Sequence, residues 1–346
     1  MTANRASRFN RRLLIRGAAA GAAVPAVLPT AAQAATGTAP SASRPSDAKT
    51  ANEGTWHAGT SNAKTSNAQT SDATFQWLGT SGWRIDTGDG RTILFDPYLS
   101  RFETGLFKKS FNPKTPLTTD GATIDRHMGR PELILVSHSH WDHLNDVPYI
   151  AAAAPDARIV GTETTYHLLR ALGVDKARIA VVRGGEVLDF DGLVVEAVSS
   201  RHSRNDTYGY FAPGTLTGPP PRPQTISDLP EGDTLAFHVT LPDGLSAFLM
   251  GASDFSERDA TGLRPDVAMI ATSSTPATHR YVPRLLKALD YPATVVPVHW
   301  DNFELPLDEG AHRDPTIDLD GFVARIREAG PGSRILLPEY ATPYRF

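Results

Sequence analysis

One short segment constrains this chain more than any other, because an apolar run ends abruptly in a cluster of ionisable side chains. Leu133-Ile134-Leu135-Val136 is a continuous apolar stretch, typical of a strand that is buried on both faces. It is followed at once by Ser137-His138-Ser139-His140-Trp141-Asp142-His143. Three histidines and an aspartate beside a buried strand are costly unless something binds them. The fold must therefore bring this strand end to a binding site.

The spacing within the cluster predicts two neighbouring metal-binding points. His138 and His140 are two residues apart, so extended backbone would point both side chains to the same side. Asp142 and His143 follow where the chain turns into a helix, and they are aimed at a second point. The chain has no cysteine, which leaves histidines and carboxylates as the strong metal ligands. Imidazole and carboxylate donors suit zinc, with manganese and iron as alternatives.

Three more candidate ligands each come just after a predicted apolar strand. They are His202 after residues 193–198, Asp254 after residues 246–250, and His299 after residues 294–298. Loops at strand ends are the usual place for ligands in layered folds, so one rim of the fold would gather all three. Asp254 has a structural alternative as the N-cap of a helix that begins near Phe255.

The wider pattern predicts an α/β fold with two strand-rich halves. Predicted strands cover residues 75–78, 83–86, 92–95, 133–136 and 159–160, then 179–190, 193–198, 234–241, 246–250, 267–270, 294–298 and 335–337. Predicted helices cover residues 147–153, 163–172, 282–289 and 319–329. Two mixed sheets packed face to face, with the helices outside, would bury both sets of strands. The Pro-rich segment 212–231 excludes regular structure and is expected near the mouth of the site.

The first 73 residues are not expected to join this core. Residues 1–35 carry five arginines, including the Arg11-Arg12 pair, then an Ala- and Gly-rich apolar run and an Ala32-Gln33-Ala34 cleavage pattern. These features predict a twin-arginine-like signal peptide, and the run is too short for a stable membrane anchor. Residues 36–73 are rich in Thr, Ser and Ala, which predicts a disordered linker. We therefore expect a secreted protein that passes transiently through the twin-arginine export machinery, with residues 74–346 as its folded domain.

The motif His138-x-His140-x-Asp142-His143, with a lone His, Asp and His downstream, resembles the metallo-β-lactamase superfamily over residues 74–304. The resemblance implies a four-layer αββα sandwich that holds two divalent metal ions. It implies one ion at His138, His140 and His202, and a second at Asp142, His143 and His299, with Asp254 bridging them. One departure concerns Asp254: the family commonly has Gly-Asp directly after the preceding strand, whereas Ala252-Ser253 intervene here.

Smaller motifs resemble one branch of that superfamily, which includes ascorbate-6-phosphate lactonase and N-acyl phosphatidylethanolamine phospholipase D. These motifs are Trp77-Leu78-Gly79, Phe95-Asp96-Pro97 and Pro297-Val298-His299. The resemblance implies a hydrolase in which a metal-bridging hydroxide attacks an ester-like bond, a phosphodiester or a lactone, of a small-molecule or lipid-like substrate. Asp142 is the candidate catalytic residue that orients the nucleophile and shuttles its proton. Asp96 is expected to support a turn or a ligand rather than to bind metal.

Three other functions fit the sequence less well. True β-lactamases of this class usually have Cys in place of the bridging Asp, and this chain has no Cys. A di-iron oxidoreductase on this fold normally has a carboxylate at the position of His140 and adds a flavin domain. A metal-binding protein without catalysis would be expected to lose ligands, whereas all seven are present. The net charge of −4 gives no sign of nucleic-acid binding, and the sequence does not predict an oligomeric state.

Overall fold

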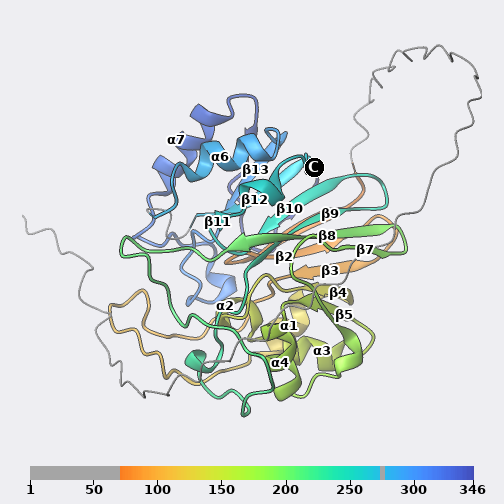
Figure 1. The fold of residues 1–346 in the computed structure, drawn as a ribbon, viewed down its shortest axis with the longest axis vertical. Coiled ribbons are helices and arrows are strands. Elements are labelled where there is room, and N and C mark those ends of the chain that lie inside the picture. Colours follow the sequence, from red (N-terminus) through yellow and green to blue (C-terminus); the bar gives the residue numbers. More distant parts are fainter. Residues whose placement is uncertain (1–70, 273–276) are drawn as a thin grey trace, which may run out of the picture. The chain divides into compact units, whose positions relative to one another are not determined.

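The computed structural model describes residues 71–272 and 277–346, so the predicted signal peptide and nearly all of the predicted linker lie outside the described residues. The described chain forms two β-sheets with helices on their outer faces (Figure 1). The first sheet has the strand order β15-β1-β2-β3-β4-β5-β6. Its strands are β1 (Thr74–Gly79), β2 (Gly82–Asp86), β3 (Thr92–Phe95), β4 (Pro131–Leu135), β5 (Arg158–Gly161), β6 (Ile179–Val181) and β15 (Pro343–Tyr344).

The second sheet has the order β11-β8-β9-β10-β12-β13-β14, with β7 paired to β8 beside this path. Its strands are β7 (Val187–Phe190), β8 (Leu193–Arg201), β9 (Leu235–Thr240), β10 (Ser246–Met250), β11 (Asp254–Phe255), β12 (Val267–Ala271), β13 (Thr294–Val298) and β14 (Arg334–Ile335). The α-helices are α1 (Gly121–His127), α2 (Trp141–Leu144), α3 (Val147–Ala153), α4 (Glu163–Ala171), α5 (Glu257–Ala260), α6 (Tyr281–Ala288) and α7 (Leu319–Ala329). Short 3-10 helices cover Lys176–Arg178, Ile226–Asp228 and Leu307–Glu309.

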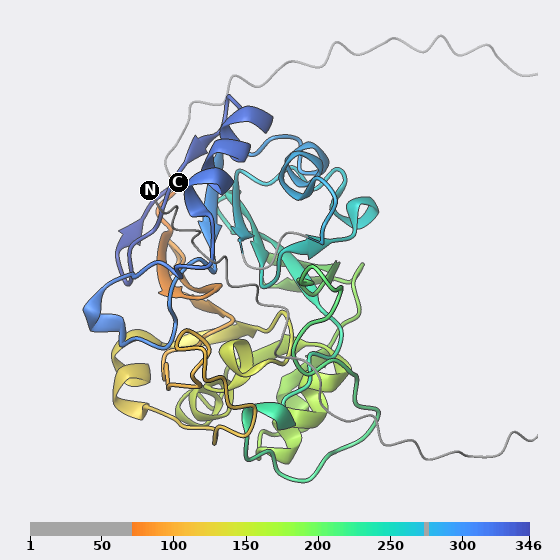
Figure 2. The same ribbon diagram turned by 90° about the vertical axis from the view of Figure 1, so that its left-hand side faces the viewer.

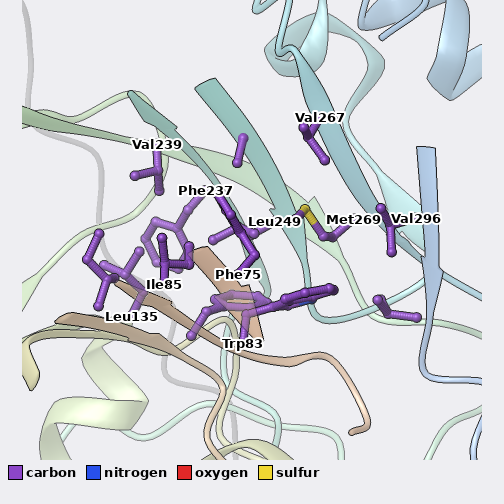
Figure 3. Packing of buried hydrophobic residues seen from close by; sticks show 14 of the residues in the cluster. Phe75, Trp83, Ile85, Leu135, Phe237, Val239, Leu249, Val267, Met269 and Val296 are labelled. Carbon is purple, nitrogen blue, oxygen red and sulfur yellow. The ribbon is translucent and has the colours of Figure 1, made fainter. Parts of the chain in front are cut away.

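The central strands of the two sheets are buried on both faces, which explains why they are apolar at successive positions. In β4, Leu133 and Leu135 point into the core between the sheets, whereas Ile134 packs with residues of α3 and α4. Figure 3 shows Phe237 and Leu249 of the second sheet facing Trp83 and Ile85 of the first. Side chains that alternate across a strand thus fill two different layers.

The helices divide between the two outer faces and complete four layers. Helices α1, α3 and α4 cover the first sheet, and α6 and α7 cover the second (Figures 1 and 2). On the second side, Phe248 of β10 packs with Leu285 of α6 and Phe322 of α7. The predicted αββα sandwich is therefore confirmed. Within the described residues, no helix combines the length and the apolarity that a membrane crossing requires.

The predicted elements differ from the observed ones mainly at chain reversals. The strand predicted over 179–190 is two strands, β6 and β7, that belong to different sheets. Gly184 and Gly185 separate them with φ values of 104° and 98°, a conformation that glycine adopts without a steric penalty. This turn carries the chain from the first sheet to the second. Helix α1 and strands β11 and β15 were not predicted from the sequence.

A buried polar network joins the first strand of the fold to its last segment. The guanidinium of Arg101 lies 3.3 Å from the carboxylate of Asp301, and both side chains are almost fully buried. The hydroxyl of Tyr340 donates to Asp301 at 2.6 Å, and the ring of Tyr340 packs on Trp77 of β1. Nearby, β15 pairs antiparallel with β1 and forms one edge of the first sheet.

Candidate metal centre

Three of the predicted ligands form a tri-histidine cluster, which consists of His138, His140 and His202. One nitrogen from each of the three rings lies within 4.8 Å of the others. His138 and His140 come from the turn after β4, and His140 is the N-cap residue of α2. His202 comes directly after β8 of the other sheet. The cluster therefore joins the two sheets at one rim, as the sequence analysis expected.

Three others form a second group, the Asp142 cluster, which consists of Asp142, His143 and His299. The Nε2 atoms of His143 and His299 each lie 3.4 Å from Oδ2 of Asp142. Asp142 and His143 lie on the single turn of α2, and His299 follows β13. The rings of His138 and His143 are 3.9 Å apart between centroids, so the two clusters are immediate neighbours.

His299 has a strained backbone with φ of 59°. Such values are rare for residues other than glycine and are concentrated at functional sites. The strained peptide is held on both sides, because its N–H donates to the carbonyl of Thr80 at 2.7 Å and its carbonyl accepts from the hydroxyl of Thr272 at 3.0 Å. These bonds aim the ring of His299 at Asp142.

The hydrogen bonds of the histidine rings leave the nitrogens that a metal ion needs. In the tri-histidine cluster, Nδ1 of His202 lies 2.8 Å from the carbonyl of Ser203, which leaves Nε2 as a ligand. Nδ1 of His138 contacts the hydroxyl of Ser137 at 3.0 Å, whereas its Nε2 is buried with no partner among the described residues. A buried polar atom without a partner is costly, and a cation in the cluster would supply one. The donor set therefore fits a metal ion.

Asp96 supports the Asp142 cluster through hydrogen bonds, although it is not itself in either group of ligands. Its carboxylate accepts from Nδ1 of His143 at 2.8 Å and from the backbone N–H of Ser137 at 2.7 Å. It also accepts from the hydroxyl of Ser137 at 2.5 Å. Asp96 is fully buried and has φ of 41°. The expectation that Asp96 supports a ligand rather than binding metal agrees with this geometry.

The electrostatics of the two clusters differ. Burial lowers the pKa of each tri-histidine ring, to about 4 for His140 and well below the usual value for His138 and His202. These rings are therefore neutral at physiological pH, the form that binds metal. Burial also lowers the pKa of His143, but Asp142 and Asp96 outweigh it and raise that pKa to about 10. Burial opposes ionisation of Asp142, yet His143 and His299 hold its pKa well below the usual value.

Asp254, the predicted bridging ligand, is not part of either cluster. It lies in β11, where it pairs with Arg201 of β8, and its Oδ1 accepts from the backbone N–H of Phe255 at 2.8 Å. Residues directly opposite each other in a sheet share a face, whereas successive residues point to opposite faces. The side chain of Asp254 is therefore on the side of Arg201 and away from that of His202. The structure thus places Asp254 outside both groups of ligands, and its bridging role stays a prediction.

The loop after His202 contains site residues that are not evident from the sequence. Tyr210 stacks on His202 with ring centroids 4.7 Å apart, and its hydroxyl donates to Glu231 at 2.7 Å. The carbonyl of Ala212 lies 3.4 Å from Nε2 of His140. Both ends of the Pro-rich segment 212–231 thus lie against the metal centre. No sequence motif marks these contacts, and only the position of the loop directly after His202 pointed to it.

A cavity of about 490 Å³ lies beside His202, the one ligand of the two clusters in its lining. Its lining includes His202 and Tyr210, together with Arg201, Arg204 and Glu231. This volume lies in the range of small-molecule sites.

The αββα sandwich and the two ligand clusters at its rim define a metal-dependent enzyme of the metallo-β-lactamase fold. Residues 74–299 match the family described as a beta-lactamase superfamily domain, and the chain belongs to this family.

Curated relatives and solved structures agree with this assignment. A "UPF0173 metal-dependent hydrolase" from Polynucleobacter asymbioticus is 28% identical over 237 residues, which cover 65% of this chain and 73% of the relative. A protein of the same name from a Polaromonas strain is 26% identical over 268 residues, covering 75% and 87%. The structure of Igni18, a metallo hydrolase from Ignicoccus hospitalis, matches with a TM-score of 0.52 at 18% identity, covering 79% of this chain and 98% of Igni18. This chain is a metal-dependent hydrolase.

Proposed function

We propose that the protein is an exported binuclear hydrolase that cleaves an ester-like bond, a phosphodiester or a lactone. The observation that carries the proposal is the pairing of two three-ligand clusters whose nearest rings, His138 and His143, are 3.9 Å apart. Two ions held as neighbours are the usual arrangement in binuclear hydrolases. Nitrogen and carboxylate donors without thiolates support zinc first, with manganese or iron as alternatives.

When bound, the divalent ions activate a water molecule as the nucleophile and withdraw charge from the bond that is cleaved. The residues of the chain orient that water and accept its proton. Asp142 has a second carboxylate oxygen besides the Oδ2 that faces His143 and His299, so it can orient the water and accept its proton. Asp96 fixes the ring of His143 through Nδ1 and keeps Nε2 directed at the cluster.

The choice of an ester-like substrate rests on the resemblance to the lactonase and phospholipase D branch. The motifs at residues 77–79, 95–97 and 297–299 support that branch. The cavity beside His202, with a volume of about 490 Å³, has room for a small-molecule or lipid-like group. A di-iron oxidoreductase remains the alternative on the same fold, and the presence of His140 among the ligands favours the hydrolase.

The export proposal rests on residues 1–35 alone. A twin-arginine signal carries proteins that are already folded, so the metal centre could be filled before export. Replacing Arg11 and Arg12 by Lys and measuring the protein in the medium and in the cell tests it. Retention of the variant inside the cell is the expected result, and unchanged secretion would contradict the route.

The central experiment combines metal analysis of the purified protein with a panel of phosphodiester, lactone and β-lactam substrates. We expect two ions per chain, hydrolysis of a phosphodiester or a lactone, and no β-lactam cleavage. His140→Ala should lose an ion and nearly all activity, whereas His279→Ala, at an exposed histidine, should resemble the wild type. Full activity in His140→Ala would refute the proposed mechanism.

A further inference from the structure

The loop that follows His202 contacts two of the three rings of the tri-histidine cluster. The ring of Tyr210 stacks on the ring of His202, with an angle of 24° between the two ring planes. Two residues further on, the carbonyl of Ala212 lies 3.4 Å from Nε2 of His140. The first contact fixes the plane of one ligand ring, and the second directs Nδ1 of the other ring into the cluster.

Glu231 fixes this loop to the metal-binding motif. Its carboxylate accepts from the hydroxyl of Tyr210, and its backbone N–H donates to the carbonyl of Ala212 at 2.9 Å. Its own carbonyl accepts from the N–H of Ser139 at 3.0 Å, the residue between His138 and His140. The residue is 6% exposed. One buried residue therefore connects Tyr210, Ala212 and the motif.

We propose that Tyr210 and Glu231 are positioning residues that set the affinity of the tri-histidine cluster for its metal ion without affecting the Asp142 cluster. The inference rests on the proposed function, because it requires an ion at each cluster. Residues that orient metal ligands typically change metal affinity by about 10- to 100-fold when they are removed. The effect is local because a different residue, Asp96, orients His143 in the second cluster.

Because Asp254 is in neither cluster, the metal affinities of the two clusters can be changed and measured separately. No carboxylate among the described residues belongs to both groups of ligands. Each ion would therefore be held by three side chains of its own, and a change at one cluster need not move the ligands of the other.

The test is a titration of the metal-free protein with Zn²⁺ against a chromophoric chelator, repeated with Co²⁺ by visible absorption. His202→Ala and His299→Ala assign the two binding steps to the two clusters. Tyr210→Leu, which removes the stacked ring, should weaken the tri-histidine step by about 10-fold. Tyr210→Phe keeps the ring and should have a smaller effect. In Glu231→Gln the side-chain oxygen can still accept from Tyr210, and its amide can donate to the hydroxyl of Thr234, which now donates to Glu231. This variant should therefore remain near the wild type, whereas Glu231→Ala should resemble Tyr210→Leu.

Two matched controls lie in the same loop. Tyr208 is 70% exposed, so Tyr208→Leu should leave both steps unchanged, as should Asp206→Asn at an exposed carboxylate. The inference is overturned if Tyr210→Leu leaves the tri-histidine step unchanged, or if it weakens both steps equally. A wild-type protein that binds no ion at the tri-histidine cluster would refute the binuclear centre itself, and this result would appear before any loop variant is made.

Discussion

Replacing Asp96 by Asn tests how the protein controls the ring of His143. The two carboxylate oxygens of Asp96 accept from three donors, the N–H and hydroxyl of Ser137 and Nδ1 of His143. Asn has one acceptor oxygen, which would remain with the backbone N–H of Ser137. Its amide nitrogen would then face Nδ1 of His143 and donate to it. The proton of the ring would move to Nε2, the nitrogen directed at Asp142, and would oppose metal binding.

The size of the effect follows from the role of a ligand-orienting partner. Loss of such a partner weakens metal binding by about 10- to 100-fold, or about 1.4 to 2.7 kcal/mol. We expect the larger value, because Asn favours the wrong tautomer rather than only releasing the ring. The backbone should tolerate the change, since Asn adopts positive φ more readily than most residues. The tri-histidine step should change less than the Asp142 step, because in the described structure Asp96 reaches the tri-histidine cluster only through the hydroxyl of Ser137, which contacts Nδ1 of His138.

The assay is a two-step Zn²⁺ titration of Asp96→Asn, together with ¹⁵N chemical shifts of the histidine rings. Asp156→Asn, at an exposed carboxylate, is the control for the loss of one negative charge. An unchanged affinity of the Asp142 cluster, or a His143 ring that keeps its proton on Nδ1, would refute the reasoning.

Three further predictions use other parts of the molecule. Asp254→Asn should leave two ions bound with affinities within about twofold of the wild type, because Asp254 is in neither cluster; metal analysis after gel filtration would contradict this if an ion were lost. Between pH 9 and 7, the Zn²⁺ affinity of the Asp142 cluster should fall by about tenfold per pH unit, because the pKa of His143 is about 10 and its proton competes with the ion more strongly as the pH falls. The tri-histidine affinity should stay nearly constant, since burial lowers the pKa values of its rings, and equal slopes in Zn²⁺ titrations would contradict this difference. Phe237→Ala in the core should lower the free energy of unfolding, measured in urea, by about 3–5 kcal/mol. Val187→Ala, at a side chain that is 62% exposed, should change it by less than about 0.5 kcal/mol. Equal losses of stability in the two variants would contradict the role given to burial.

The sequence predicted best those ligands that are joined rigidly to a buried strand. His138 and His140 follow β4 within a few residues, and His299 follows β13 directly. His202 likewise follows the last residue of β8. Once the strands are placed in two facing sheets, little freedom remains in where such residues lie. The four-layer fold was predictable for the same reason, because long apolar strands and amphipathic helices allow few layered arrangements.

Asp254 was not predictable in this way, because three residues separate it from β10. Residues 251–253 turn the chain into β11, and pairing with Arg201 then decides which side the carboxylate takes. A shift of one residue in that register would reverse the side. Sequence alone does not specify such a register.

The support of the tri-histidine cluster was hidden for a different reason. Tyr210 and Glu231 are 21 residues apart in the chain, and the segment between them has no periodic pattern. Their contact depends on how a Pro-rich loop closes on itself. Local secondary-structure propensities do not predict which residues meet when a long loop closes.

The pairing of β1 with β15 has a consequence for synthesis of the protein on the ribosome. Phe75 pairs with Tyr344, a partner that is translated almost last among the described residues. Until that partner is available, β1 has an unpaired edge. The bond from Tyr340 to Asp301 likewise waits for residue 340. An exposed strand edge favours contacts with other chains. The nascent domain should therefore be prone to aggregation until residues 343–344 are free to pair with β1, and a chaperone would protect it during that interval.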